Sequence, residues 1–207
     1  MREPVVITDA VNEPITLAEL QAQARIDTTD AAQDDLINDV FIPAARDYIE
    51  WRAGITVHEK TLELVMDCFP YSGPITLPHA TPLISITSVK YKDSDGTETT
   101  WASSNYVTSA GGPRELGKIA PAYGQAWPSF TPYPLDPVRI RYKGGIATAS
   151  PIVDASATVK HAMCLLVSKM WLYREAVIVP DRPGINQLVM EYGLEPMIMR
   201  LQATYAF

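Results

Sequence analysis

Residues 84–101, ISITSVKYKDSDGTETTW, decide the fold class of this chain. From Ile84 to Tyr91, apolar residues recur in the pattern of a half-buried strand. Residues 93–96, DSDG, favour a turn, because aspartate and serine side chains bond to nearby backbone and glycine accepts a positive φ. Residues 97–101 are therefore predicted to return as the hairpin partner of the first strand.

Further strand patterns lie on both sides of this hairpin. Residues 62–66 and residues 138–142, VRIRY, alternate between apolar and polar positions, and residues 106–108 add a shorter segment. Most of the chain's 17 prolines fall between residues 70 and 151, where they separate the strand patterns. We therefore predict a small antiparallel sheet in the middle of the chain.

Helical patterns precede the sheet. Thr16 and Glu19 form a capping box, which predicts a helix from Leu17 to about Arg25. A polar stretch follows, and its acidic residues are predicted to cap the next helix rather than to bind a cation, because the spacing of a calcium loop is missing. These acidic residues are Asp27, Asp30, Asp34 and Asp35.

A longer helix is predicted from about Ala31 to Arg52, with Gly54 as its C-terminal cap. Pro43 lies inside it and cannot donate a backbone hydrogen bond, which predicts a kink near Asp39. Its apolar stripe is predicted to comprise Leu36, Ile37, Val40, Phe41, Ala44, Tyr48 and Ile49.

The last third of the chain is helical again. Residues 155–175 contain neither glycine nor proline and predict one long helix. Residues 185–201 predict a weaker helix, interrupted by Gly193 and Pro196. The buried stripe of the long helix is predicted to comprise Val159, Ala162, Met163, Leu166, Val167 and Met170.

These patterns predict an α+β fold, in which a small helical bundle carries an inserted antiparallel β subdomain. The N-terminal helices and the long C-terminal helix form the bundle. The expected parts are residues 1–54 (N-terminal helical part), 55–150 (β subdomain), 151–176 (long helix) and 177–207 (C-terminal docking tail).

The composition excludes several classes of function. The chain has 207 residues and a formal net charge of −7, with Lys and Arg scattered, so we expect no specific binding to nucleic acid. Cys68 and Cys164 are far apart and are interpreted as buried thiols. No apolar stretch has the length of a signal peptide or a membrane span, so we expect synthesis in the cytoplasm and no membrane partner.

The histidines and acidic turns give no catalytic or metal-binding pattern. His58, His79 and His161 have no histidine or cysteine at ligand spacing, and the usual nucleotide, nucleophile and zinc motifs are absent from the sequence. Asp93 and Asp95 are interpreted as the tip of the hairpin. We therefore expect no catalytic residue, metal or cofactor.

Two aromatic or apolar segments are candidate interfaces. Residues 123–134 place aromatic side chains among prolines, which suits a contact surface, a small core over the end of the sheet, or a sugar platform. Residues 177–207 contain apolar pairs, which suggest a segment that cannot bury itself alone and docks on another protein chain. The candidate residues are Tyr123, Trp127, Phe130, Tyr133, Met197, Ile198, Tyr205 and Phe207.

The order of several motifs resembles the head–tail connector (adaptor) proteins of tailed phages. The resemblance extends over about residues 13–176. Its main motifs are residues 15–19 (ITLAE), 34–37 (DDLI), 44–50 (AARDYIE), 82–91 (PLISITSVKY), 138–142 (VRIRY) and 159–162 (VKHA).

The resemblance implies a structural subunit rather than an enzyme. Such proteins form a ring, commonly of twelve subunits, under the portal protein in the virion neck, where they extend the DNA channel and dock stopper and tail proteins. Twelve acidic subunits would let DNA pass without binding it specifically. A stopper or tail-completion protein is the alternative function, and a remote one is a DNA- or glycan-acting enzyme using Asp93, Asp95 and Glu98.

Overall fold

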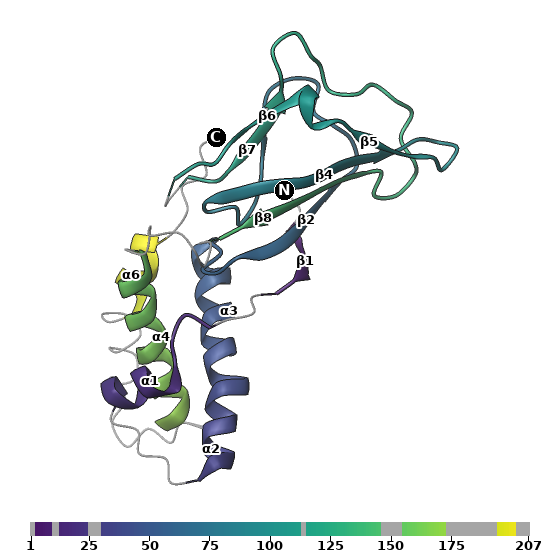
Figure 1. Cartoon of the computed structure of the whole chain (residues 1–207). Coiled ribbons are helices and arrows are strands. Elements are labelled where there is room, and N and C mark those ends of the chain that lie inside the picture. The colour runs from purple at the N-terminus through teal and green to yellow at the C-terminus, as the bar shows by residue number, and fades with distance from the viewer. Residues whose placement is uncertain are drawn as a thin grey trace. The chain divides into compact units, whose positions relative to one another are not determined.

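The protein is described by a computed structural model covering residues 3–9, 13–24, 30–112, 115–145, 155–172 and 194–201. The chain divides into two compact units. The β unit contains the described residues of 1–10 and 58–150, and the helical unit contains those of 11–57 and 151–202. This confirms the predicted mixture of helices and antiparallel sheets (Figure 1).

The β unit contains two antiparallel sheets (Figure 1). The larger sheet has the strand order β1 (Val5–Thr8), β2 (Lys60–Met66), β8 (Val138–Gly144), β4 (Leu83–Lys92) and β5 (Glu98–Trp101). The smaller sheet has the order β3 (Ile75–Thr76), β7 (Lys118–Pro121) and β6 (Tyr106–Ser109), with a 3-10 turn, η2 (Ser103–Asn105), before β6. The sequence patterns did not predict β1, β3 or β7, and residues 1–54 were expected to be helical.

Strand register explains the core of the β unit. Ile140 of β8 lies opposite Leu64 of β2 and Val89 of β4, so three apolar side chains from adjacent strands share one face. Side chains alternate along a strand, which places Arg139 and Arg141 on the other face. The core also includes Ile75 of β3 and Ile119 of β7, so both sheets contribute to it.

The helical unit consists of four helical segments in the described residues. They are α1 (Leu17–Ala24), the continuous stretch of α2 (Ala31–Leu36), η1 (Ile37–Phe41) and α3 (Ile42–Ala53), then α4 (Ala155–Leu172) and α6 (Glu195–Leu201). α4 contacts α1, α3 and α6. Most of its predicted stripe is buried, from Val159 to Val167, whereas Met170 is half-buried.

A π-helical turn, η1, shifts the buried face of the second helix. Pro43 cannot donate to the carbonyl of Asp39, and the π turn includes Asp39, where the sequence predicted a kink. A π turn adds one residue, so burial continues from Ile37 to Ile42 and Ile49. The predicted stripe was wrong at Val40 and Ala44, which are exposed. The prediction assumed an unbroken α-helical period, and the π turn breaks that period.

The capping box, the cap by Asp30 and the Gly54 cap are confirmed, whereas Asp27 lies outside the described residues. In the capping box, the Thr16 backbone N–H donates to Glu19 Oε2 at 2.9 Å and the Glu19 N–H donates to Thr16 Oγ1 at 3.2 Å. Asp30 caps α2 by accepting from the Ala32 N–H at 3.1 Å. Gly54 ends α3 with a φ of 66°.

A buried ionic cluster in the helical unit was not predicted. Arg46, which is 2% exposed, donates from Nε to Glu13 Oε2 at 3.0 Å, and its Nη1 lies 3.5 Å from Glu50 Oε2. Glu50 Oε1 also accepts from the Val57 N–H at 2.7 Å. The cluster therefore ties α3 to chain segments on both sides of it.

Candidate assembly surfaces

Trp127 belongs to the core of the β unit. It is 8% exposed, and its ring stacks on Phe69 with centroids 5.1 Å apart and an angle of 11° between the planes. Its Nε1–H donates to the Gly73 carbonyl at 3.0 Å, and Trp101 lies 5.0 Å away. These contacts place Trp127 in a small core, which was one of the alternatives for this segment, and not on a contact surface.

The remaining aromatic candidates divide between core and surface. Phe130 is half-buried, with its ring 4.9 Å from that of Tyr91. Tyr123 is fully exposed, and Tyr133 is 37% exposed. Lys92 Nζ lies 4.0 Å from the centre of the Tyr133 ring, within range of a cation–π contact. Tyr123 and Tyr133 therefore remain surface candidates.

The candidate tail is described over α6 alone. Ile198 is fully buried, Met197 is half-buried and Met199 is 61% exposed. Arg52 Nη2 of α3 lies 3.3 Å from Glu195 Oε2, which adds an ion pair to the contact between α3 and α6. Ile198 is therefore a core residue of this unit and not a free docking residue. Tyr205 and Phe207 lie outside the described residues.

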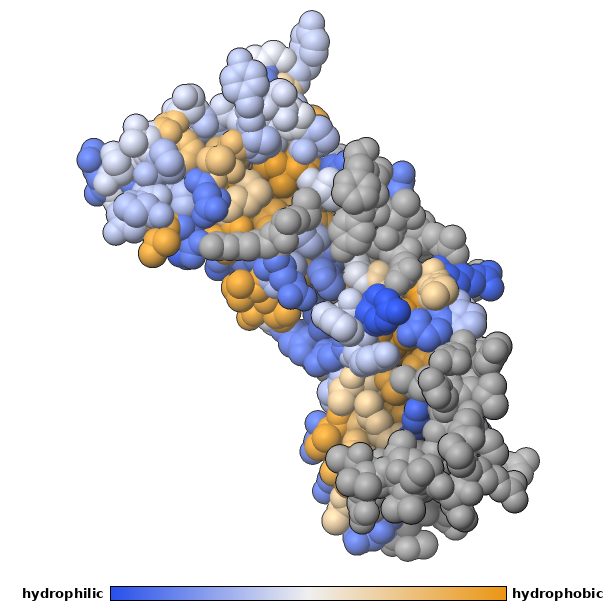
Figure 2. Space-filling model, turned by 180° about the vertical axis from the view of Figure 1, so that it is seen from behind, coloured by the Kyte–Doolittle hydropathy of each residue, from blue (hydrophilic) through white to orange (hydrophobic). Residues whose placement is uncertain are grey.

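Exposed apolar side chains occur on both units. The edge strand β1 exposes Val5, Val6 and Ile7 by 42–54%. In the helical unit, Trp51 of α3 is 65% exposed. Figure 2 shows apolar patches among polar residues on one face of the molecule. An exposed edge strand and exposed aromatic residues are features of protein–protein contact sites.

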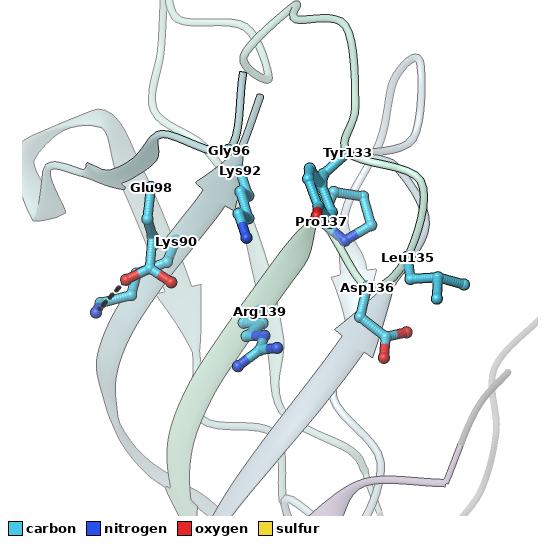
Figure 3. A pocket seen from close by; sticks show the side chains of 9 residues that line it. All are labelled: Lys90, Lys92, Gly96, Glu98, Tyr133, Leu135, Asp136, Pro137 and Arg139. Atoms are coloured by element: carbon cyan, nitrogen blue, oxygen red, sulfur yellow. Dashed lines mark hydrogen bonds and ion pairs between the residues drawn. The ribbon is translucent and has the colours of Figure 1, made fainter. Parts of the chain in front are cut away.

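A pocket of about 300 Å³ opens on the polar face of the larger sheet (Figure 3). Its loop wall is held in place because the Lys92 N–H donates to the Pro137 carbonyl at 2.8 Å and the Tyr133 N–H donates to the Lys92 carbonyl at 3.1 Å. The pocket is lined by Lys90, Lys92, Gly96, Glu98, Tyr133, Leu135, Asp136, Pro137 and Arg139.

The charges around this pocket are unequally paired. Lys90 Nζ lies 2.6 Å from Glu98 Oε1, and this bond lowers the pKa of Glu98. On the same face, Arg141 pairs with Glu63 at 2.8 Å. Arg139 is exposed and has no ion pair or hydrogen bond with any described residue. Arg139 is therefore the most available cation of the pocket.

The described residues contain no group of three or more His, Cys, Asp or Glu side chains that could hold a metal ion. Exposed His161 forms a hydrogen bond with Gln23, and Asp93 Oδ1 accepts from the Thr97 N–H at 2.9 Å, as expected for the tip of a hairpin. Cys68 is exposed, which contradicts its interpretation as a buried thiol, whereas burial raises the pKa of Cys164. Among the described helices, none combines the length and apolarity needed to cross a membrane.

Comparison with protein families gives one match, in the N-terminal part of the chain. The family model of the phage gp6-like head-tail connector proteins matches residues 14–110. Over these residues, the chain is similar to the head-tail connector proteins, and the match supports that family. The match covers α1 to α3 and the strands from β2 to β6, and it confirms the resemblance for the motifs between residues 15 and 91. A search of curated proteins gave no significant match.

Solved structures resemble this chain over its whole length. A chain of the virion of a native gene transfer agent particle has a TM-score of 0.72 and 20% identity, and the match covers 100% of this chain and 98% of that one. A chain in the neck of the empty particle, computed with C6 symmetry, has a TM-score of 0.70 at 19% identity and the same coverage. A chain in the neck of the native particle, computed with C12 symmetry, has a TM-score of 0.68 at 20% identity, again with the same coverage. These likenesses establish the fold.

The pocket was not predicted, although the sequence contains part of its signal. The alternation of residues 138–142 already placed Arg139 on the face opposite Ile140. Lys90 of β4 lies opposite Arg139 of β8 because these two strands are neighbours in the sheet. Strand order cannot be derived from a local sequence pattern. The exposure of Trp51 was not predicted, because the π turn shifts which face of α3 is exposed.

Proposed function

We propose that this protein is a structural head–tail connector, or adaptor, of a phage-like particle and has no catalytic activity. The observation that carries the proposal is the match of residues 14–110 to the connector family, joined to a likeness with neck chains that covers the whole chain. A connector acts through its shape and its contacts, which fits a chain whose described surface includes exposed apolar side chains and a charged pocket.

We propose further that twelve copies form a ring under the portal protein and provide a platform for stopper and tail proteins. A closed ring needs two different lateral surfaces on each subunit, because its contacts are head-to-tail. A helical unit with an inserted sheet supplies such unlike surfaces. The C12 symmetry of one similar neck structure supports the number of subunits.

In this arrangement DNA passes through the ring without being held. Each copy has a formal charge of −7, and a ring of such copies repels phosphate overall. The proposal thus places the protein in the virion neck after synthesis in the host cytoplasm.

Electron cryo-microscopy of the purified particle tests this function. The expected result is a ring of this protein in direct contact with the portal protein. A position beyond another ring, away from the portal, would identify a stopper or tail-completion protein instead. Absence of the protein from the neck, or turnover of DNA or glycan by the purified protein, would overturn the proposal.

The residues after Leu201, which include Tyr205 and Phe207, are proposed to dock on a neighbouring subunit or on the portal. Removing residues 202–207 keeps α6 and its buried Ile198, so the shortened protein should melt near the wild-type temperature. It should be depleted from purified particles. A shortened protein that fills the neck as wild type does would refute this docking role.

A further inference from the structure

The pocket on the larger sheet contains two cations that form no ion pair with a described carboxylate and act on Glu98 only at a distance. Arg139 makes no ion pair with any described residue, and Lys92 contacts the Tyr133 ring instead of an acid. Figure 3 shows the charged ends of both side chains at the pocket. Leu135, which is 74% exposed, adds an apolar wall beside them.

The helical unit carries the opposite charges, also without partners among the described residues. Asp35 of α2 and Asp39 of η1 are exposed, and neither pairs with a described cation. They are four residues apart in one continuous helical stretch, where like charges repel each other and weaken the helix. Val40, beside Asp39, is 49% exposed. This surface therefore combines negative charge with an apolar side chain.

We propose that the pocket formed by Lys92, Arg139 and Leu135 receives the α2–η1 segment of the neighbouring copy in the ring. This inference rests on the proposed function, because it concerns contacts between subunits. Asp35 and Asp39 approach Lys92 and Arg139, and Val40 packs on Leu135. The contact is head-to-tail, since one copy contributes its β unit and the next contributes its helical unit.

Charge complementarity favours this occupant. A carboxylate and a guanidinium form strong charge-assisted hydrogen bonds, and such pairs also fix the register of an interface. Binding would relieve the repulsion between Asp35 and Asp39 by placing cations beside both carboxylates. Each subunit would then give a close carboxylate partner to cations that, by itself, it places near Glu98 without a direct ion pair.

The same pocket is a poor fit for DNA. Two of its lining residues, Glu98 and Asp136, are acidic, and Glu98 already neutralises Lys90. A surface that follows a phosphate backbone presents a run of cations with few acids. The local composition therefore suits a protein segment with a few carboxylates better than a polyanion.

Charge reversal in the full-length protein tests the contact. Arg139→Glu and Asp39→Lys, each alone, should lower the incorporation of the protein into the neck by about tenfold or more, because each creates like charges across the interface. Incorporation is measured as copies per particle by quantitative mass spectrometry. Melting temperatures of the isolated variants should stay near that of the wild type, because neither side chain has an ion-pair partner among the described residues.

The decisive variant combines Arg139→Glu and Asp39→Lys in one chain. Every interface of the ring would then contain the wild-type pair with its two charges exchanged, so incorporation should recover to near the wild-type value. Lys118→Glu is the matched control, because it places a carboxylate instead of a cation on β7, away from the pocket. This control should leave incorporation unchanged.

The outcomes separate this inference from the proposed function. Normal incorporation of Arg139→Glu, or no recovery in the combined variant, would overturn the contact while the wild-type ring still supports the connector function. If Arg139→Glu is incorporated normally but its particles retain less DNA, the pocket would be assigned to nucleic acid, and the proposed contact would also be overturned. Absence of the wild-type protein from the neck would overturn both proposals.

Discussion

The two units of the protein solve the problem of burial differently. The β unit fills its core with aromatic and aliphatic side chains, among which Phe69, Trp101 and Trp127 pack ring against ring. The helical unit buries the guanidinium of Arg46 between two glutamates next to its apolar core. An apolar core is destabilised by a cavity, whereas a buried ionic cluster is destabilised when one charge loses its partner. The two units should therefore fail by different mechanisms when single residues are changed.

The largest expected effect is in the aromatic core. Trp127→Ala should lower the free energy of unfolding by about 4 kcal/mol, because it leaves a cavity beside Phe69 and removes the bond to the Gly73 carbonyl. Chemical denaturation followed by fluorescence or circular dichroism measures this change. Tyr123→Ala is the matched control, since that ring is fully exposed, and it should change stability by less than about 0.5 kcal/mol. Equal effects of the two substitutions would contradict the placement of Trp127.

A slightly smaller effect is expected in the helical unit. Arg46→Met should cost about 3 kcal/mol, because Glu50 is then buried without its cation. Adding Glu50→Gln to this variant should recover part of the loss, since the amide is neutral and its oxygen still accepts from the Val57 N–H. A double variant less stable than Arg46→Met would show that the charge of Glu50 is not the source of the loss.

In both units, the features that could be predicted from the sequence are those that depend on local patterns. Local patterns predicted the capping box at Thr16 and Glu19 and the buried positions of α4, because each depends on residues within one or two helical turns. Alternation placed Ile140 inside and Arg139 outside in the same way. These features involve one element at a time.

The remaining features depend on contacts between distant residues. Strand β1 is short, and its pairing of Val5 with Glu63 spans most of the N-terminal helical region, so no local signal could reveal it. The π turn moved the buried face by one residue, which a fixed helical period cannot anticipate. The candidate surfaces were only partly predicted for the same reason. Trp127 and Tyr123 lie in the same proline-rich segment, and no local pattern distinguishes them. Tertiary packing buries Trp127 and leaves Tyr123 exposed.

A smaller effect tests how closely the backbone is packed within the β unit. A Cβ on Gly117 would lie 2.3 Å from Leu83 Cβ, so Gly117→Ala should cost about 2 kcal/mol through strain between β4 and the chain leading into β7. Gly112→Ala is the control in the same connection, because a Cβ there meets no described atom within 4 Å. Thermal melting of the two variants should differ clearly, and equal melting temperatures would refute the close approach.

The smallest effect compares one surface ion pair from each unit. Lys160 and the Thr16 N–H lower the pKa of Glu19 in the helical unit, whereas Lys90 lowers the pKa of Glu98 in the β unit. A lowered pKa means that each carboxylate stabilises the folded state above its unfolded pKa, and that this contribution is lost as the pH falls through the folded value. Because both pairs are exposed, their effect on stability should be small and should weaken with salt.

Titration of the carboxyl groups by nuclear magnetic resonance can separate the two causes. Lys90→Met should return the pKa of Glu98 most of the way to its ordinary value, because the remaining cations act on it only at a distance. Lys160→Met should raise the pKa of Glu19 only in part, since the Thr16 N–H still donates to that carboxylate. A complete return of Glu19 would mean that the capping box contributes nothing to its acidity, and the two units would then hold their surface carboxylates in the same way.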